Sequence, residues 1–310
     1  MKPSLKKILN PQSYFRFIQH RLREHRQLRR PNYRAVLTYP PGHYYSPLLD
    51  VESLKPGETS LPHDGVEYWE HADLSGEKQR GYFADLLERF PFLPFPKERT
   101  PDWRYYIENA WFLLPDAFTL SAIIRKEKPR RIIEVGSGFS SAVMLDTLNH
   151  TGATAALTFI EPFPERLNSL LSPADKLSAK ILVKPVQEVP LEVFAQLEAQ
   201  DILFIDSSHV AKIGSDVVFL LLRVLPSLKP GVLIHFHDIF YPSTYPADWL
   251  REGRAWNESL FLRAFLLRNL DFEFLAFNSF AAHSFPEIFQ KQFPAFLTQP
   301  GSSLWLRKTG

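Results

Sequence analysis

The stretch RIIEVGSGFSS, residues 131–141, decides the fold of this chain. Its first five residues are a β-rich apolar run, and a helical pattern begins directly after the stretch. Gly136 and Gly138 permit a tight turn and the close approach of a ligand. Ser140 or Ser141 can cap the helix, whose unpaired N–H groups favour an anionic group. The stretch therefore predicts a strand, a ligand-binding bend and a helix in succession.

Strand and helix patterns alternate through the following residues. The β-rich apolar runs lie at 131–135, 155–160, 180–183, 201–205 and 231–236, and helical segments lie at about 140–149, 164–171, 190–198 and 215–225. Units of this size build a parallel sheet covered by helices on both faces. Two late strands, 272–277 and 302–307, are joined by residues 278–301 and are expected to form an antiparallel edge. We therefore predict an α/β fold with a seven-stranded, mostly parallel sheet and an antiparallel edge strand.

The composition limits the chemistry that the chain can perform. It has 310 residues, 36 Lys and Arg against 34 Asp and Glu, and no cysteine. The lack of cysteine excludes disulfides, thiolate zinc sites and cysteine nucleophiles, and it fits a reducing compartment. No apolar run approaches the roughly 18 residues of a membrane span, and the start MKPSLKKILN lacks the apolar segment of a signal peptide. We therefore expect a cytoplasmic protein.

The charge is distributed unevenly along the chain. Residues 1–34 hold ten Lys or Arg and one acid, a net charge of +9 against −7 for the remainder. Segment 11–30 has the apolar spacing of an amphipathic helix. A membrane surface, a nucleic acid or an acidic partner could attract this arm, or it could dock on the acidic body. We predict three parts: a basic arm at 1–35, an extension or cap of helical and irregular structure at 36–115, and a ligand-binding domain at 116–310.

Three classes of ligand suit a glycine-containing bend of this kind. A dinucleotide fingerprint requires a third glycine where Ser141 stands, and a phosphate-binding P-loop requires a Gly-Lys pair that is absent. S-adenosylmethionine (SAM) remains, because its carboxylate suits the helix start and its amino and sulfonium groups suit an acid such as Glu134. Glu161 ends the second strand, 25 residues after Gly136, where an acid can hydrogen-bond ribose hydroxyls. These features favour an adenosine-type ligand.

Polar side chains also close the fourth and fifth strands. Asp206 follows the run 202–205 and precedes His209, while His237 and Asp238 end the run 231–236. Ligands of open α/β sheets bind at these carboxyl ends. A buried Asp without a partner is costly, which argues against these residues being core filler.

Three roles for this polar group stay open. In the first, Asp206, His237 and Asp238 hold a divalent ion. In the second, His209 or His237 acts as a general base on a hydroxyl, because an imidazole titrates near neutral pH. In the third, the residues form a structural hydrogen-bond network. His235 and His237 point to the same face of the strand, so they need not both serve one site.

Four motifs in order, IIEVGSGFSS, FIEP, DILFIDSSH and GVLIHFHDIF, resemble those of class I SAM-dependent methyltransferases. More narrowly, they resemble a bacterial-type branch similar to small-molecule O-methyltransferases. The resemblance covers about residues 100–310. It departs from the superfamily pattern at Ser140, which replaces a third glycine and leaves room for a differently seated methionine tail.

The resemblance implies a Rossmann-like methyltransferase fold with SAM as cofactor. It implies that the region 184–190 borders the adenine ring. The cofactor residues that follow are Glu134, Gly136, Ser137, Gly138, Ser140, Ser141, Glu161, Gln187, Glu188 and Asp206. Metal-dependent O-methyltransferases are similar in placing an acid at strand four and two polar ligands at strand five, where the ion lowers the pKa of the acceptor oxygen. His237 stands where relatives have an acid, which weakens the case for magnesium and leaves softer metals open.

Two aromatic segments are candidates for substrate contacts. The segment 240–249, FYPSTYPADW, is long enough to be a lid and contains Tyr241 and Tyr245. Tyr105 and Asn109 lie just upstream of the core; packing of the extension explains them equally well. We expect methyl transfer to a hydroxyl oxygen of a small molecule, such as a saccharide or a natural product. The alternatives are a NAD-type oxidoreductase and a non-catalytic SAM-binding or scaffold protein; specific nucleic-acid binding is not expected.

Overall fold

The computed structural model describes residue 39, residues 42–48, residue 69 and residues 72–310. The chain divides into two compact units, Met1–Pro56 and Gly57–Gly310. In the first unit, residues 42–48 form turns in which the rings of His43 and Tyr44 stack at 4.5 Å. The predicted basic arm and its amphipathic helix lie outside the described residues, so they stay predictions.

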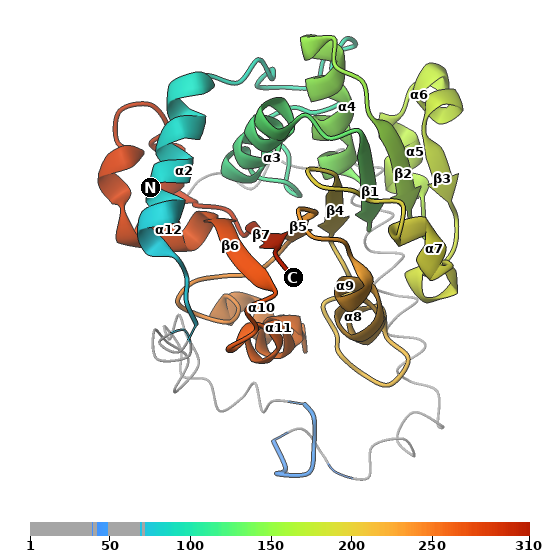
Figure 1. The fold of residues 1–310 in the computed structure, drawn as a ribbon, viewed down its shortest axis with the longest axis vertical. Coiled ribbons are helices and arrows are strands. Elements are labelled where there is room, and N and C mark those ends of the chain that lie inside the picture. Colours follow the sequence, from blue (N-terminus) through green and yellow to red (C-terminus); the bar gives the residue numbers. More distant parts are fainter. Residues whose placement is uncertain (1–38, 40–41, 49–68, 70–71) are drawn as a thin grey trace. The chain divides into compact units, whose positions relative to one another are not determined.

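The second unit is built on one seven-stranded sheet (Figure 1). Its strands are β1 (Arg131–Val135), β2 (Ala156–Ile160), β3 (Lys180–Leu182), β4 (Ile202–Ile205), β5 (Leu233–Phe236), β6 (Phe272–Phe277) and β7 (Leu304–Lys308). The order across the sheet is β3-β2-β1-β4-β5-β7-β6. The first five strands pair in parallel, while β7 runs antiparallel to both neighbours. The predicted α/β class and mostly parallel sheet are confirmed, with β6 and β7 as the antiparallel edge pair.

Helices cover both faces of this sheet. They are α2 (Gly76–Arg89), α3 (Leu114–Glu127), α4 (Phe139–Thr151), α5 (Glu165–Leu170), α6 (Pro173–Ser178), α7 (Leu191–Phe194), α8 (Asp216–Phe219), α9 (Leu225–Ser227), α10 (Ala247–Arg251), α11 (Glu258–Leu266), α12 (Asn278–Ser284) and α13 (Ala295–Thr298). Short 3-10 turns occupy Val186–Glu188 and Pro286–Ile288, and a π-helical turn, Leu220–Val224, joins α8 to α9.

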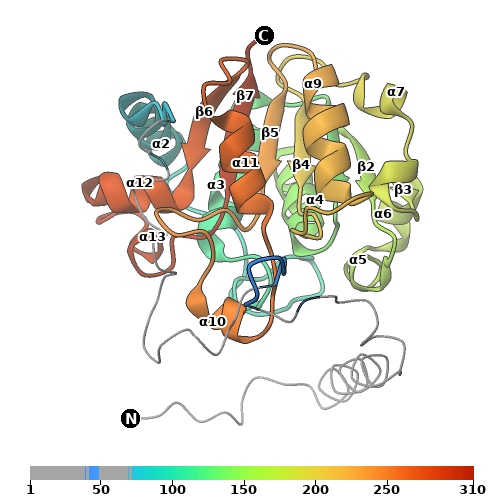
Figure 2. The ribbon, with the colours of Figure 1, turned by 90° about the horizontal axis from the view of Figure 1, so that it is seen from below.

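Two hydrophobic clusters hold the layers together. One packs α2, α3 and α4 on the sheet through residues such as Phe83, Phe118 and Phe204. The other packs α8, α9 and α11 on the opposite face, through residues such as Leu220 and Leu262. Figure 2 shows α9 and α11 across one face with α3 and α4 behind the sheet. Because both faces are covered, the central strands are continuous apolar runs, as β4 is with four buried residues.

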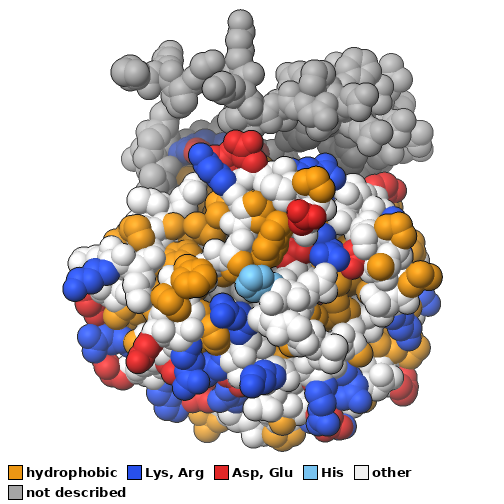
Figure 3. All heavy atoms as spheres, turned by 90° about the horizontal axis from the view of Figure 1, so that it is seen from above, with side chains coloured by type: hydrophobic (Ala, Val, Ile, Leu, Met, Phe, Trp, Pro, Cys, Tyr) orange, Lys and Arg blue, Asp and Glu red, His pale blue; other side chains and the backbone are white. Residues whose placement is uncertain are grey.

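The surface carries both signs of charge. In the view of Figure 3, basic and acidic side chains lie interspersed among apolar ones on the described part of the molecule. Among the described helices, none has the length and apolar character required to cross a membrane.

Candidate cofactor and acceptor site

The bend between β1 and α4 requires glycine at position 136. Gly136 has φ +77, and a Cβ added there would lie 1.8 Å from the carbonyl oxygen of Asp206. Its N–H donates to Ile160 O at 3.0 Å, while the N–H of Asp206 donates to Val135 O at 2.8 Å. The ends of β1, β2 and β4 therefore meet at this bend, and no side chain fits between them.

Glu134 is buried inside the bend, and it stabilises the bend from within. Its carboxyl group is fully buried and accepts hydrogen bonds from the hydroxyls of Ser140, at 2.6 Å, and Ser141. Burial raises the pKa of Glu134 to about 8, although these hydroxyls favour the ionised form. Glu134 therefore has a structural role at the start of α4, and its expected contact with the methionine part of SAM stays a prediction.

This role predicts that Glu134→Gln retains both the fold and the ligand affinity. At pH 5, where the buried carboxyl is protonated, a neutral amide should change stability by no more than about 1 kcal/mol. The pKa of Glu134 is higher in the folded protein than in the unfolded chain. The wild-type protein therefore has the full stability from this group below the unfolded-state pKa, and it loses that stability as the pH rises toward 8. The variant lacks that loss, so its stability relative to wild type should increase from pH 5 to pH 8 in urea unfolding. A folded Glu134→Gln variant with tenfold weaker binding of S-adenosylhomocysteine (SAH) would contradict the structural role.

Glu161, at the end of β2, lines a cavity of about 400 Å³. Its carboxylate accepts the N–H of Ser137 at 3.0 Å and the N–H of Phe163 at 2.8 Å. Gln187 lines the same cavity and donates to Gly214 O at 2.9 Å, whereas Glu188 is exposed and outside the lining. The structure thus brings Glu161 and Gln187 together, but not Glu188. We refer to this space as the smaller cavity.

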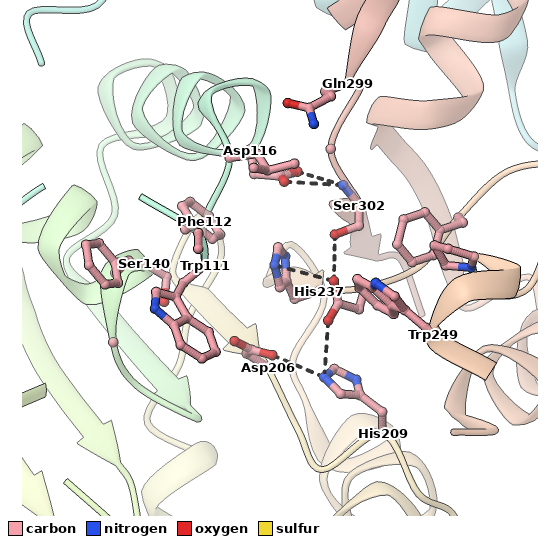
Figure 4. Close-up of a pocket in the computed structure, with 18 of the residues that line it drawn as sticks. Trp111, Phe112, Asp116, Ser140, Asp206, His209, His237, Trp249, Gln299 and Ser302 are labelled. Atoms are coloured by element: carbon pink, nitrogen blue, oxygen red, sulfur yellow. Dashed lines mark hydrogen bonds and ion pairs between the residues drawn. The ribbon is translucent and has the colours of Figure 1, made fainter. Parts of the chain in front are cut away.

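A larger cavity of about 630 Å³ opens beside it (Figure 4). Its lining includes the predicted residues Ser137, Gly138, Ser140, Asp206, His209, His237 and Asp238. Aromatic side chains and the 298–302 turn complete the wall. Asp206 lines both cavities, so they adjoin at the end of β4.

His209 is held among three carboxylates. Its Nδ1 lies 2.8 Å from Glu258, and its Nε2 lies 3.3 Å from Asp206 and 3.6 Å from Asp238. Burial lowers its pKa, but the hydrogen bonds to Asp206 and Glu258 outweigh burial and place the pKa well above the ordinary value. Both ring nitrogens of His209 therefore face carboxylates, and the general-base role expected of it stays a prediction.

His237 differs from His209 because neither of its ring nitrogens makes a hydrogen bond within the described chain. Its Nε2 lies 3.6 Å from Asp238 Oδ1, beyond hydrogen-bond distance, and its Nδ1 has no partner. Burial lowers its pKa, but the charges of Asp238, Asp206 and Asp116 outweigh burial and raise it. This histidine lies in the wall of the larger cavity, so it retains the base role open to it.

Asp238 and Asp116 are fixed by the turn before β7. Asp238 has φ 57, a left-handed conformation that is uncommon for a residue other than glycine, and accepts a hydrogen bond from Ser302 Oγ at 2.9 Å. Asp116, at the start of α3, accepts the N–H groups of Ser302 and Ser303 at 3.0 Å. The turn that leads into β7 therefore positions the carboxylate of Asp238, which follows β5.

His235 belongs to the core rather than to the site. Its ring stacks on Phe204 at 3.7 Å, and its Nε2 lies 2.9 Å from Ser303 Oγ. Burial lowers its pKa well below the ordinary value. The two histidines of β5 share a face of the strand, as predicted, but only His237 reaches the larger cavity.

The four aromatic and amide candidates for substrate contact have structural roles. Tyr105 is fully buried, and its hydroxyl donates to Phe112 O at 2.9 Å. Asn109 closes the turn before Phe112 by accepting its N–H at 2.8 Å. Tyr245 is buried and its hydroxyl accepts the N–H of Ser259, while Tyr241 packs against Phe280 at 5.0 Å. None of these four residues lines either cavity, because the side chain of each one contacts neighbouring residues of the protein instead.

Other residues take their place in the larger cavity. Trp111, Arg166, Trp249, Arg254, Trp256 and Ser302 all line it, and Glu258 supports His209 from behind. Trp249 lies in the segment 240–249 that the sequence marks as a candidate lid, but nothing in the spacing shows which of its side chains point inward. Arg166 and Glu258 follow ordinary helical patterns and gave no signal.

The site combines a glycine bend, an acid at the end of the second strand and a cavity that both line, an arrangement that is also found in adenosine-binding α/β domains. Residues 133–239 match a sequence-family model described as a methyltransferase domain. An uncharacterized protein of Archaeoglobus fulgidus is 29% identical over 171 residues, which cover 52% of this chain and 74% of that protein.

Two solved structures are more distant. The SAH-bound methyltransferase PaMTH1 of Podospora anserina has 16% identity and a TM-score of 0.41, with 82% of this chain and 91% of that chain covered. The structure titled cmcI-D160 Mg-SAM has 15% identity and a TM-score of 0.41, with 72% and 84% covered. Similarity at this level does not identify an acceptor.

Residues 133–239, which carry the match to a methyltransferase domain, run from β1 past the end of β5 and include the glycine bend and the polar ends of β2, β4 and β5.

Proposed function

We propose that this protein transfers the methyl group of SAM to a hydroxyl oxygen of a small-molecule acceptor. The observation that carries the proposal is the meeting of two cavities at Asp206. The smaller cavity, with Glu161 and Gln187, suits adenosine. The bend at Ser137 and Gly138 leads from it into the larger cavity, where the acceptor would lie. A cytoplasmic location is part of this proposal.

The chemistry is an in-line displacement at the sulfonium methyl group. The acceptor oxygen forms a bond to the methyl carbon, the carbon–sulfur bond breaks, and neutral SAH leaves. His237 Nε2 takes the hydroxyl proton, and the charge of Asp238 at 3.6 Å stabilises the resulting imidazolium. The protein contributes alignment of the reactants and a wall of aromatic side chains that excludes water.

The described residues also fit a divalent ion. Donor atoms of Asp206, His209 and Asp238 lie within 4.8 Å of one another. Glu258 on the other nitrogen of His209 is the carboxylate partner that metal-bound histidines commonly have. The set differs from the predicted one because His209 replaces His237. A bound ion would lower the pKa of the acceptor hydroxyl.

Calorimetric titration with SAH and with NADH tests which cofactor the protein binds. The test variant is Glu161→Gln, and its matched control is Glu188→Gln. We expect wild type to bind SAH and not NADH. Glu161→Gln should weaken SAH binding by about 1–3 kcal/mol, because ribose hydroxyls lose a charged acceptor. Glu188→Gln should bind as wild type does, since Glu188 is exposed and outside the cavity.

The other functional classes give different results in this titration. Binding of NADH without SAH would replace the proposal by an oxidoreductase. Binding of SAH without methyl transfer to any hydroxyl acceptor, in assays with and without Mg²⁺ or Mn²⁺, would leave a SAM-binding scaffold protein.

A further inference from the structure

Arg166 projects over the glycine bend from α5. A Cβ added at Gly138 would lie 3.1 Å from Arg166 Cδ. The aliphatic part of the Arg166 side chain therefore passes over the bend at Gly138, which has no side chain of its own. Its guanidinium carbon lies 3.7 Å from the ring centroid of Trp111, which fixes the charged end at the larger cavity. The bend and the arginine therefore line one end of this cavity together.

Among the described residues, Arg166 has no direct ion-pair partner. The charges of Asp206 and Glu161 act on its guanidinium from a greater distance. The other arginine of the cavity, Arg254, is neutralised by Glu252 at 2.9 Å. Of these two cations, only Arg166 is available to an anionic group at the bend.

A second donor at the bend also lacks a partner. Ser137 Oγ is buried in a residue that is 8% exposed, and it makes no hydrogen bond in the described structure. It lies close enough to Glu134 to favour the ionised form of that carboxyl group, but it makes no hydrogen bond of normal geometry with it. Ser137 lines the same cavity as Arg166. An unsatisfied buried hydroxyl beside an unpaired cation is the donor set that a carboxylate satisfies.

We propose that Arg166 and Ser137 bind the α-carboxylate of the methionine part of SAM and thereby fix the direction of the sulfonium methyl group. This inference rests on the proposed function, because it assumes SAM at the bend. The carboxylate would also lie near the first turn of α4, whose N–H groups have no intrahelical acceptors. Arg166 is thus assigned as a cofactor-binding residue.

The test compares SAH with S-adenosyl-3-thiopropylamine, which lacks only the carboxylate, by calorimetry. Arg166→Gln should weaken SAH binding about ten- to a hundredfold, the range for a charged hydrogen bond, and leave the decarboxylated analogue unchanged. Ser137→Ala should weaken SAH binding by a smaller factor with the same selectivity, and Arg166→Lys should retain part of the affinity.

Arg125→Gln is the matched control. Arg125 also stacks on an aromatic ring, at 4.1 Å from Phe90, and burial also lowers its pKa, but it lines neither cavity. Thermal unfolding checks that each variant is folded. The assignment of Arg166 would be overturned if Arg166→Gln lost the same affinity for SAH and for the decarboxylated analogue, or lost none. It would also be overturned if the variant kept its SAH affinity but had a raised KM for the acceptor. Failure of wild type to bind SAH would overturn the proposed function as well.

Discussion

Gly136→Ala is expected to destabilise the domain by more than about 4 kcal/mol and to abolish SAH binding. A left-handed backbone costs an L-residue about 1–2 kcal/mol, and the added Cβ would lie 1.8 Å from the carbonyl oxygen of Asp206. Because that oxygen belongs to the backbone at the end of β4, relief requires separating β1 from β4. Urea unfolding and calorimetry measure the two effects.

Gly152→Ala separates the clash from the conformational strain. Gly152, which ends α4, has φ +66, but a Cβ there meets nothing within 4 Å. This control should therefore cost only about 1–2 kcal/mol and leave SAH affinity unchanged. If Gly136→Ala proved as mild as the control, the close approach of the two strands would not govern the site.

His237→Gln is expected to lower kcat by about 10²- to 10⁴-fold with SAH affinity unchanged, the effect of losing a general base. The raised pKa of His237 gives the sign of the pH dependence. Wild-type activity should rise with pH through a pKa above the ordinary histidine value, because only the neutral ring accepts a proton. The variant should lack that rise.

His283→Gln serves as the control, because this histidine is exposed and lies outside both cavities. The divalent-ion interpretation gives a different pattern. If an ion alone lowers the pKa of the acceptor, His237→Gln should retain most activity with Mn²⁺, whereas Asp206→Asn and Asp238→Asn should lose it. That pattern would remove His237 as the base.

The succession of strands along the chain and the positions of their polar ends could be predicted from the sequence. Period, length and turn residues are local signals, and each parallel strand here is a continuous apolar run because both faces are buried. The helix expected at 190–198 is only Leu191–Phe194, because Pro190 precedes it and the chain turns again before β4. The placement of Asp206, His237 and Asp238 at one end of the sheet followed from the same topology.

The contacts inside the site could not be predicted, because they depend on pairs distant in sequence. Glu258 lies 49 residues from His209, and its approach to Nδ1 engages the ring nitrogen that faces away from Asp206. The spacing of strand residues does not show that the hydroxyls of Ser140 and Ser141 bind Glu134. Tyr105 and Tyr245 are aromatic residues near loops, and only packing shows that they are buried.

A crystal structure of the protein with SAH tests the central claim most directly. We predict the nucleoside in the smaller cavity, with ribose hydroxyls on Glu161, and the homocysteine part over Ser137 and Gly138 with its sulfur directed toward the larger cavity. A structure that shows SAH elsewhere, or the smaller cavity closed by the protein's own side chains at saturating SAH, would contradict the account.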